Sequence, residues 1–249
     1  MMFQALPQEI QDLLTVLEYW DEILEGFIMM IWLYVWALVI GFFLGLFLAI
    51  LRQYGGAIIS RIATGYIEIV RGTPLLAQIL LLYFLPYSLN IPIERWAFYT
   101  NFRISDREMT FILLNPEILV GILALSLNSA AYQAEYLRGA ITSVGTEQLV
   151  AAQSLGMSRR AGIVHIVLPQ ALRRVIPAWS NEAAYLPKYT IVVWYIGVPE
   201  LFGKAHYLVF KEFIPEATFI IIAIIFLVLI STVSKVLDVI HKRTAIPGL

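Results

Sequence analysis

One stretch of this sequence limits the fold more than any other: residues 26–51, which contain no Asp, Glu, Lys or Arg. As a helix, this stretch would extend about 39 Å, which exceeds the roughly 30 Å of hydrocarbon in a bilayer. Ordinary soluble domains have about 25% charged residues. This chain of 249 residues has 14%, with a mean hydropathy of +0.78. The composition therefore excludes an ordinary soluble enzyme and indicates an integral membrane protein.

Four further stretches have the length and the low charge of a membrane span. They cover residues 62–87, 118–137, 175–194 and 217–234. We therefore predict an all-α integral membrane protein with about five transmembrane helices. An odd number of spans places the two termini on opposite sides of the membrane.

The distribution of Lys and Arg predicts the orientation, because cytoplasmic loops carry an excess of these residues. With the N-terminus outside, ten of the 17 basic residues lie inside, five lie outside, and Arg71 and Lys188 lie at membrane depth. We therefore predict an external N-terminus and a cytoplasmic C-terminus. The chain then comprises an external amphipathic segment over 1–25, a transmembrane domain over 26–240 and a cytoplasmic tail over 241–249.

Ionised side chains within the spans are candidate functional residues, because each costs about 2.5 to 3.5 kcal/mol to insert. Glu68 and Arg71 are three residues apart on one helix face, as are Glu135 and Arg138, so each couple can neutralise itself or extend its charged ends to the inner surface. Glu182 and Lys188 differ, because a spacing of six places them about 240° apart around a helix. A direct ion pair between these two is geometrically poor.

Two prolines predict interruptions of the second and fourth spans. Pro187 cannot donate a hydrogen bond to the carbonyl of Ala183, and Pro74 leaves the carbonyl of Val70 without its helical donor. We therefore predict helix breaks at Pro187 and over Gly72 to Pro74. Non-helical backbone at membrane depth survives where it is buried in protein or lines a wet cavity.

The cytoplasmic segment over 145–168 has the pattern of two short helices, because Gly156 is a stop signal and Ser158 a typical N-cap. Ala151, Ala152 and Gly156 form a patch small enough for another protein to approach closely. On spacing alone, a docking site and a membrane-surface hairpin both remain open. A DNA-binding helix-turn-helix is disfavoured, because a segment tethered between two spans would have little access to a duplex.

The spacing of these residues is similar to that of a known family. The residues Ala151, Ala152 and Gly156, followed by IVLP at 166–169, resemble the EAA cytoplasmic loop of binding-protein-dependent ABC-importer permeases. The sequences RGTPLL at 71–76 and LNSAAY at 127–132 resemble the polar amino-acid branch of that family. The resemblance covers about residues 25–240.

Two positions depart from the family pattern. Val150 lies where the family usually has a glutamate, and Tyr189 follows Lys188 where an aspartate is more common. Glu147 lies one turn before Val150 on the same helix face, so it is a candidate for the missing contact with the ATPase. Alternatively, this chain is one half of a heterodimer whose other half keeps the glutamate.

The resemblance implies a type I ABC-importer-like permease subunit that is not itself an enzyme and holds no cofactor. Its implied partners are a second permease chain, identical or homologous, two ATPase subunits that bind ATP, an external substrate-binding protein and membrane lipid. The loop over about 143–169 would be the coupling loop, with Glu147, Ala151, Ala152 and Gly156 facing the ATPase. The implied location is the cytoplasmic (inner) membrane of a bacterium or archaeon.

The absence of an ATP-binding motif from the sequence agrees with ATP binding by separate subunits. A phosphate-binding loop requires G-x-x-x-x-G-K-[ST], and the nearest approach, from Gly197 to Lys204, has the wrong spacing and no hydroxyl. The three histidines, His165, His206 and His241, are scattered, so we predict no metal site. The net charge of −1 predicts no nucleic-acid partner.

The implied substrate, an amino acid, carries an ammonium and a carboxylate, so its site needs an acceptor and a donor. We predict that Glu182 accepts the cationic group and that Lys188 or a half-helix N-terminus binds the carboxylate. A second interpretation keeps Glu182 in a subunit interface, hydrogen-bonded to Asn128 or Asn181. The predicted pathway comprises Glu182, Asn181, Lys188, Leu75, Leu76 and Arg71.

Other functions remain open at this point. Broken spans and membrane-depth charges would also suit an ion-coupled secondary transporter or a channel, although no internal inverted repeat supports this. A membrane scaffold without a transport role would leave Glu182 and Lys188 unexplained. Within the ABC class, an opine or another small zwitterion is an alternative substrate.

Overall fold

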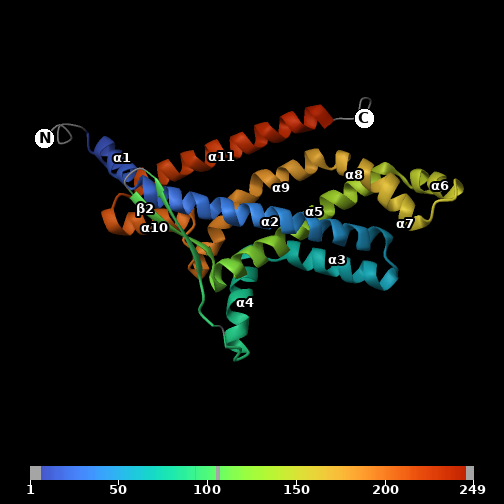
Figure 1. Ribbon diagram of the computed structural model, residues 1–249, viewed down its shortest axis with the longest axis horizontal. Helices are drawn as coiled ribbons and strands as arrows, with labels where there is room; N and C mark the ends of the chain where they lie inside the picture. The colour runs from blue at the N-terminus through green and yellow to red at the C-terminus, as the bar shows by residue number, and fades with distance from the viewer. Residues whose placement is uncertain (1–6, 93, 105–106, 245–249) are drawn as a thin grey trace. The chain divides into compact units, whose positions relative to one another are not determined.

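The computed structural model describes residues 7–92, 94–104 and 107–244, and most of them are helical (Figure 1). Within these residues three helices are long and apolar enough to cross a membrane: α2 (Trp20–Tyr54), α5 (Pro116–Val144) and α11 (Pro215–Thr244). The pair α3 (Ala57–Gly72) and α4 (Leu75–Ser88) adds a fourth span if the two are taken together. The interruption falls at Thr73 and Pro74, and Pro74 is the N-cap of α4.

The fourth predicted span, over 175–194, does not break at Pro187 as we predicted. The helix α9 (Ile176–Tyr189) continues through Pro187, and the chain then tightens into the 3₁₀-helix η3 (Thr190–Ile196). The hydroxyl of Thr190 donates a hydrogen bond to the carbonyl of Pro187 at 2.8 Å, so this local partner supports the tighter turn. The helix therefore narrows after the proline and does not break at it. With 14 residues, α9 is too short to count as a span by itself.

The chain divides into two compact units, and three long helices contribute to both. The first unit contains residues 7–37, 74–125 and 187–230 of the described chain, and the second contains residues 38–73, 126–186 and 231–244. This division cuts across the predicted segments 1–25, 26–240 and 241–249. Residues 1–6 and 245–249 of the predicted terminal segments lie outside the described residues.

The first unit contains a β-hairpin that the all-α prediction missed. Strands β1 (Phe98–Ile104) and β2 (Arg107–Leu114) pair antiparallel. Met109 and Phe111 alternate along β2 and are both buried, so one face of the hairpin packs inward. The indole of Trp32 on α2 donates a hydrogen bond to the carbonyl of Leu113 at 2.9 Å, which ties the hairpin to this helix.

Ion pairs join the start of α2 to other elements of the first unit. Glu25 pairs with Lys204 at 2.7 Å and Glu22 with Lys211 at 3.7 Å, both bases lying on α10 (Leu201–Glu212). Asp21 pairs with Arg107 on β2. We call these three pairs the ion-pair cluster. An apolar core beneath it includes residues of α1 (Gln8–Glu18), α2, α10 and α11.

The start of α10 is also fixed by a buried carboxylate. Glu200 is fully buried, and its side chain accepts hydrogen bonds from the backbone amides of Phe202 at 2.9 Å and Gly203 at 2.8 Å. Burial raises the pKa of Glu200 to about 7, although these two hydrogen bonds act in the opposite direction. The side chain thus caps the helix in place of a Ser, Thr or Asp.

In the second unit, two glycines let α2 approach α5 closely. A Cβ atom added to Gly41 would lie 2.8 Å from Nε2 of Gln133, and one added to Gly45 would lie 2.9 Å from the carbonyl oxygen of Ala130. Such pairs of small residues four apart are common where membrane helices pack together. The approach brings the backbone of α2 within reach of polar side chains on α5.

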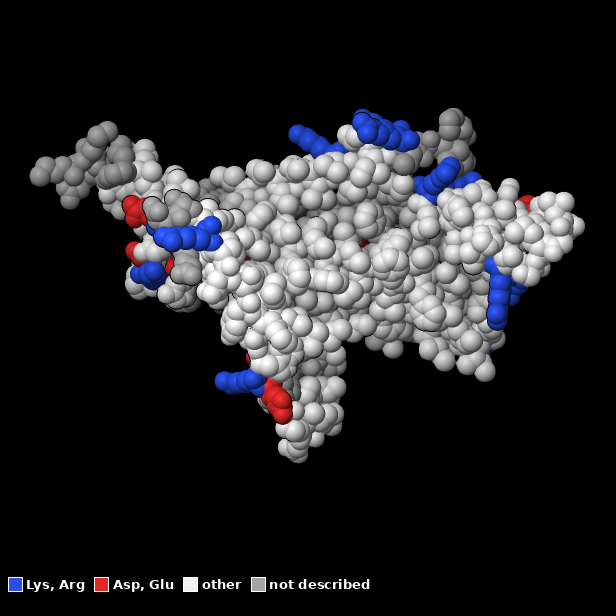
Figure 2. Space-filling view, viewed as in Figure 1, with Lys and Arg blue, Asp and Glu red and all other residues white. Residues whose placement is uncertain are grey.

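The segment that we predict to be cytoplasmic lies in the second unit. It was predicted as two short helices, and the structure has a series of short helices that continues to Arg174. They are α6 (Thr146–Ser154), α7 (Arg159–Gly162), the π-helix η2 (Ile163–Val167) and α8 (Leu168–Arg174) (Figure 1). Gly156 adopts φ of +88°, a conformation that favours glycine, and the Ser158 hydroxyl accepts a hydrogen bond from the amide of Ala161 at 3.2 Å. The predicted stop at Gly156 and the N-cap at Ser158 are confirmed. Figure 2 shows Lys and Arg gathered over the C-terminal end of α11, which carries Lys242 and Arg243.

Candidate functional site

A continuous series of hydrogen bonds joins α5 to α9 inside the second unit. The indole Nε1 of Trp179 donates to Oε1 of Gln133 at 2.7 Å, and Nε2 of Gln133 donates to Oγ of Ser129 at 3.0 Å. The hydroxyl of Ser129 in turn donates to Oε1 of Glu182 at 2.6 Å. We call these four side chains the buried polar chain.

Helix geometry explains why these side chains meet. Ser129 and Gln133 are four residues apart on α5, and Trp179 and Glu182 are three apart on α9, so each pair occupies one helix face. Gln133 also donates to the carbonyl of Leu38 at 3.3 Å, which the close approach of α2 permits. Ser129 and Gln133 are fully buried and Glu182 is 3% exposed.

The buried polar chain holds a carboxylate with neutral donors. The hydrogen bond from Ser129 uses one of the two oxygens of Glu182. No Lys or Arg forms an ion pair with Glu182 in the described part of the chain. A carboxylate in such surroundings has a strong preference for any cationic group that reaches it.

The other charged residues of the predicted spans form a separate group. Glu135 pairs with Arg138 at 3.0 Å, as predicted, and also with Arg52. Glu68 lies 3.8 Å from Arg52, whereas Arg71 lies over the ring of Tyr132, 5.3 Å from its centroid. The predicted couple of Glu68 with Arg71 is therefore wrong, because Arg52 at the end of α2 provides the cation for two carboxylates.

The remaining predicted pathway residues have different positions. Asn181 and Lys188 are exposed on α9, on either side of Glu182 in the sequence. Leu75 and Leu76 begin α4 and are half-buried, while Gly72 and Pro74 flank the interruption before it. Lys188, Leu75 and Leu76 belong to the first unit, and Glu182 belongs to the second.

The predicted coupling residues divide into exposed and buried ones. Glu147, Ala151 and Gly156 are exposed, but Ala152 is 5% exposed and packs toward Gly162 of α7. Ala152 therefore holds the short helices together and is not part of an outward patch. Val150 is 59% exposed, so the position where the family usually has a glutamate presents an apolar side chain to the surroundings.

The sequence prediction missed three members of the buried polar chain: Ser129, Gln133 and Trp179. It started from the ionised residues within the spans. A signal was present, because uncharged polar residues recur along the third predicted span at Ser126, Ser129 and Gln133 with helical spacing.

Comparison with known proteins decides the family. The model of the family described as binding-protein-dependent transport system inner membrane component matches residues 41–246. The chain belongs to this family. It is therefore the permease subunit of a binding-protein-dependent ABC importer and a multi-pass protein of the cytoplasmic (inner) membrane. ATP hydrolysis belongs to a separate ATPase subunit of such importers, so the permease is not an enzyme.

Several relatives resemble this permease over most of its length. The nopaline transport system permease protein NocM of Agrobacterium fabrum is 34% identical, covering 80% of this chain and 78% of that protein. The histidine/lysine/arginine/ornithine permease HisM of Escherichia coli is 33% identical, covering 85% and 87%. The glutamine permease GlnP of Escherichia coli is 29% identical, covering 90% and 93%.

Solved structures agree with the fold. A crystal structure of an amino acid ABC transporter with histidines matches with a TM-score of 0.77 and 32% identity, covering 92% of this permease and 97% of that chain. The MetNI methionine ABC transporter in an inward-facing conformation matches with a TM-score of 0.63 at 15% identity, which supports the fold alone. The expected type I ABC-importer fold is confirmed.

Proposed function

We propose that this permease carries polar amino acids across the membrane in an ATP-driven importer. The observation that carries this proposal is the pair of amino-acid permeases that align with 85% and 90% of the chain. The nopaline permease aligns with 80%, so an opine is not favoured over an ordinary amino acid. Membership of the ABC family sets aside the ion-coupled transporter, the channel and the scaffold.

The complete importer would contain this chain, a second permease chain, two ATPase subunits that bind ATP, and an external binding protein. Permeases of this family generally work with a partner permease, an ATPase and a binding protein. The binding protein would deliver the amino acid from outside. Closure of the ATPase dimer would then move the coupling loop and switch the spans between outward-open and inward-open states.

We assign recognition of the cationic group of the substrate to Glu182. Ser129 occupies one oxygen of this carboxylate and orients the side chain, and no ion pair with a basic residue is seen for Glu182 among the described residues. A substrate ammonium would supply the missing positive charge. Lys188 would bind the carboxylate of the substrate, and Asn181, Leu75, Leu76 and Arg71 would line the path.

Contact with the ATPase is assigned to the exposed face of α6 and the turn after it. Glu147, Ala151 and Gly156 are exposed there, and Val150 adds an apolar side chain. Apolar contact at Val150 would replace the charge that the family usually presents. Glu147, one turn away, retains a negative charge on this side.

The first experiment measures uptake of a panel of labelled amino acids into liposomes that contain the assembled importer, with ATP inside. Accumulation that requires both ATP and the binding protein supports the proposal. Uptake that follows an imposed ion gradient without ATP contradicts it. Preference for nopaline over every amino acid in the panel would shift the substrate class to opines.

The second experiment tests Glu182 by the substitution Glu182→Gln, which keeps the size and the ability to accept a hydrogen bond from Ser129. We expect a large loss of uptake of cationic substrates with normal assembly. Glu68→Gln is the matched control, because the carboxylate of Glu68 is exposed and lies beside Arg52. Unchanged rate and preference in an assembled Glu182→Gln complex would remove Glu182 from the substrate site.

A further inference from the structure

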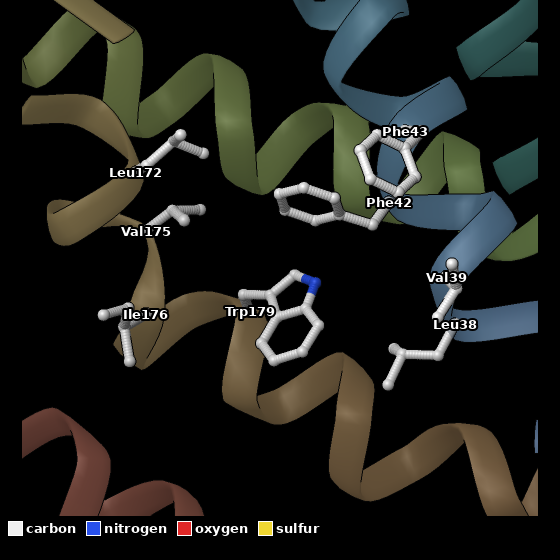
Figure 3. Close-up of a pocket in the computed structure, with 8 residues that line it drawn as sticks. All are labelled: Leu38, Val39, Phe42, Phe43, Leu172, Val175, Ile176 and Trp179. Carbon is white, nitrogen blue, oxygen red and sulfur yellow. The ribbon is translucent and has the colours of Figure 1, made fainter. Parts of the chain in front are cut away.

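An apolar groove of about 430 Å³ opens on the second unit between α2 and the α8–α9 segment (Figure 3). All of its lining side chains are aliphatic or aromatic. They are Leu38, Val39, Phe42, Phe43, Leu172, Val175, Ile176 and Trp179. Figure 3 shows Trp179 between the two walls, and its ring meets that of Phe42 edge to face at 6.1 Å between centroids. Phe43 is 65% exposed, so this wall is open to the surroundings of the helix.

The groove lies within one half of a membrane span. Leu38 stands at the centre of the uncharged stretch 26–51, and the groove extends from it toward Phe43 and the Arg52 end of α2. This length is about 7.5 Å along the helix. The groove therefore faces the acyl-chain region of one leaflet, which is the cytoplasmic leaflet in the predicted orientation.

Two basic residues lie in the turn of the chain between Leu172 and Val175, which both line the groove. They are Arg173 and Arg174. Arg173 is exposed. Arg174 donates a hydrogen bond to the carbonyl of Ser143 at the end of α5, which anchors this turn of α8.

We propose that the groove binds an acyl chain of an anionic phospholipid whose phosphate is held by Arg173. A guanidinium forms charge-assisted and often bidentate hydrogen bonds with a phosphate. Basic pockets between membrane helices on the cytoplasmic side are suited to anionic headgroups. The order of the features, cationic at one end and apolar toward the bilayer centre, matches the order of a phospholipid from headgroup to tail.

Charge favours a lipid over a second copy of this chain. In the predicted orientation, a second copy presents the same excess of Lys and Arg on the cytoplasmic side, so it brings a net positive charge toward Arg173. An anionic phospholipid brings a phosphate at the headgroup level and an apolar chain at the level of Phe43. One occupant thus satisfies both the charged and the apolar part of the site.

The occupant of the groove would also touch the buried polar chain. Trp179 lines the groove with its ring and donates its indole N–H to Gln133. An acyl chain packed against the ring would hold the indole in the orientation that this hydrogen bond requires. Loss of the lipid should therefore increase the mobility of Trp179 and lower the rate of transport.

The test uses the assembled importer in liposomes that contain phosphatidylglycerol with a photoactivatable group in the acyl chain. Peptide mapping should place the label within residues 38–43 or 172–179. Val39→Trp fills the groove and should lower labelling at least fivefold, as should Arg173→Gln. The matched controls are Phe47→Trp, on α2 outside the groove, and Arg160→Gln, on the exposed helix α7; both should label as the original chain does.

Two results would overturn the proposal. Equal labelling by phosphatidylcholine, with no effect of Arg173→Gln, would indicate ordinary bulk lipid. The chain contains no cysteine, so Val39→Cys provides a single thiol on this chain. Efficient cross-linking of that thiol to the partner permease would show that protein covers the groove.

Discussion

Glu182 and Glu25 are both carboxylates on long helices, but they are stabilised in opposite ways. Glu182 is held by the neutral hydroxyl of Ser129 within the buried polar chain, whereas Glu25 pairs with Lys204 in the ion-pair cluster. Glu25 and Lys204 are each about one fifth exposed, and Glu182 is 3% exposed. The contrast separates a carboxylate that an ion pair already neutralises from one that forms no ion pair within the described ranges 7–92, 94–104 and 107–244.

The loss of a partner should cost less free energy in the ion-pair cluster than in the buried polar chain. A partly exposed ion pair contributes about 0 to 1 kcal/mol, because water solvates both partners when they separate. A buried polar group that loses its partner costs about 1 to 3 kcal/mol. The ion-pair cluster should therefore tolerate substitution, and the buried polar chain should not.

The largest effect is expected for Gln133→Leu. This change leaves the indole N–H of Trp179 without its acceptor and Ser129 without its donor, so we expect a loss of about 1 to 3 kcal/mol in stability. We also expect uptake to fall by about tenfold, the equivalent of 1.4 kcal/mol. Thermal unfolding of the purified complex and liposome uptake measure the two effects. Wild-type behaviour in both would mean that the buried polar chain is not a functional unit.

Gly45→Ala should be nearly as damaging, because the added Cβ would lie 2.9 Å from the backbone carbonyl of Ala130, which cannot move aside. We expect a loss of about 1 to 3 kcal/mol in stability from overpacking. Gly139→Ala on α5 is the control, since a Cβ there meets nothing within 4 Å. Thermal unfolding of both variants checks this, and equal stability would argue against close packing of α2 on α5.

A smaller effect is expected in the ion-pair cluster. The coupling free energy between Glu25 and Lys204, from the double-mutant cycle of Glu25→Gln and Lys204→Met, should be about 0.2 to 1 kcal/mol. It should decrease further at high salt, because ions screen exposed charges. A coupling free energy as large as the stability lost in Gln133→Leu would contradict the expected difference between the ion-pair cluster and the buried polar chain.

The last prediction concerns pH and Glu200. Because burial raises its pKa to about 7 from an ordinary value of 4.5, the folded state binds a proton that the unfolded state has lost. The stability that this proton contributes is present below about pH 4.5 and is lost as pH rises to about 7. Glu200→Gln should remove this part of the pH dependence, measured as thermal midpoints from pH 5 to 8. An identical pH profile in the variant would exclude Glu200 as its source.

Much of the architecture could be predicted from residue order. The span at 26–51 was predictable because the thickness of the bilayer requires a long uncharged helix. The interruption at Pro74 followed from a missing amide donor, but the same argument was wrong at Pro187, where Thr190 and a 3₁₀ turn accommodate the proline. The hairpin was missed because its alternation is short and its burial depends on the helices beside it.

The sequence by itself determined that this chain is a membrane protein of the ABC-importer permease family, because apolar length, charge distribution and motif spacing are properties of residue order. Only the tertiary structure decided which polar groups meet. Arg52 reaches Glu135 on another helix, and the hydroxyl of Ser129 donates to Glu182, a contact that the residue spacing did not predict. Such contacts join residues 50 or more positions apart, so they depend on how closely the helices pack. Between α2 and α5, two glycines on α2 permit the close approach.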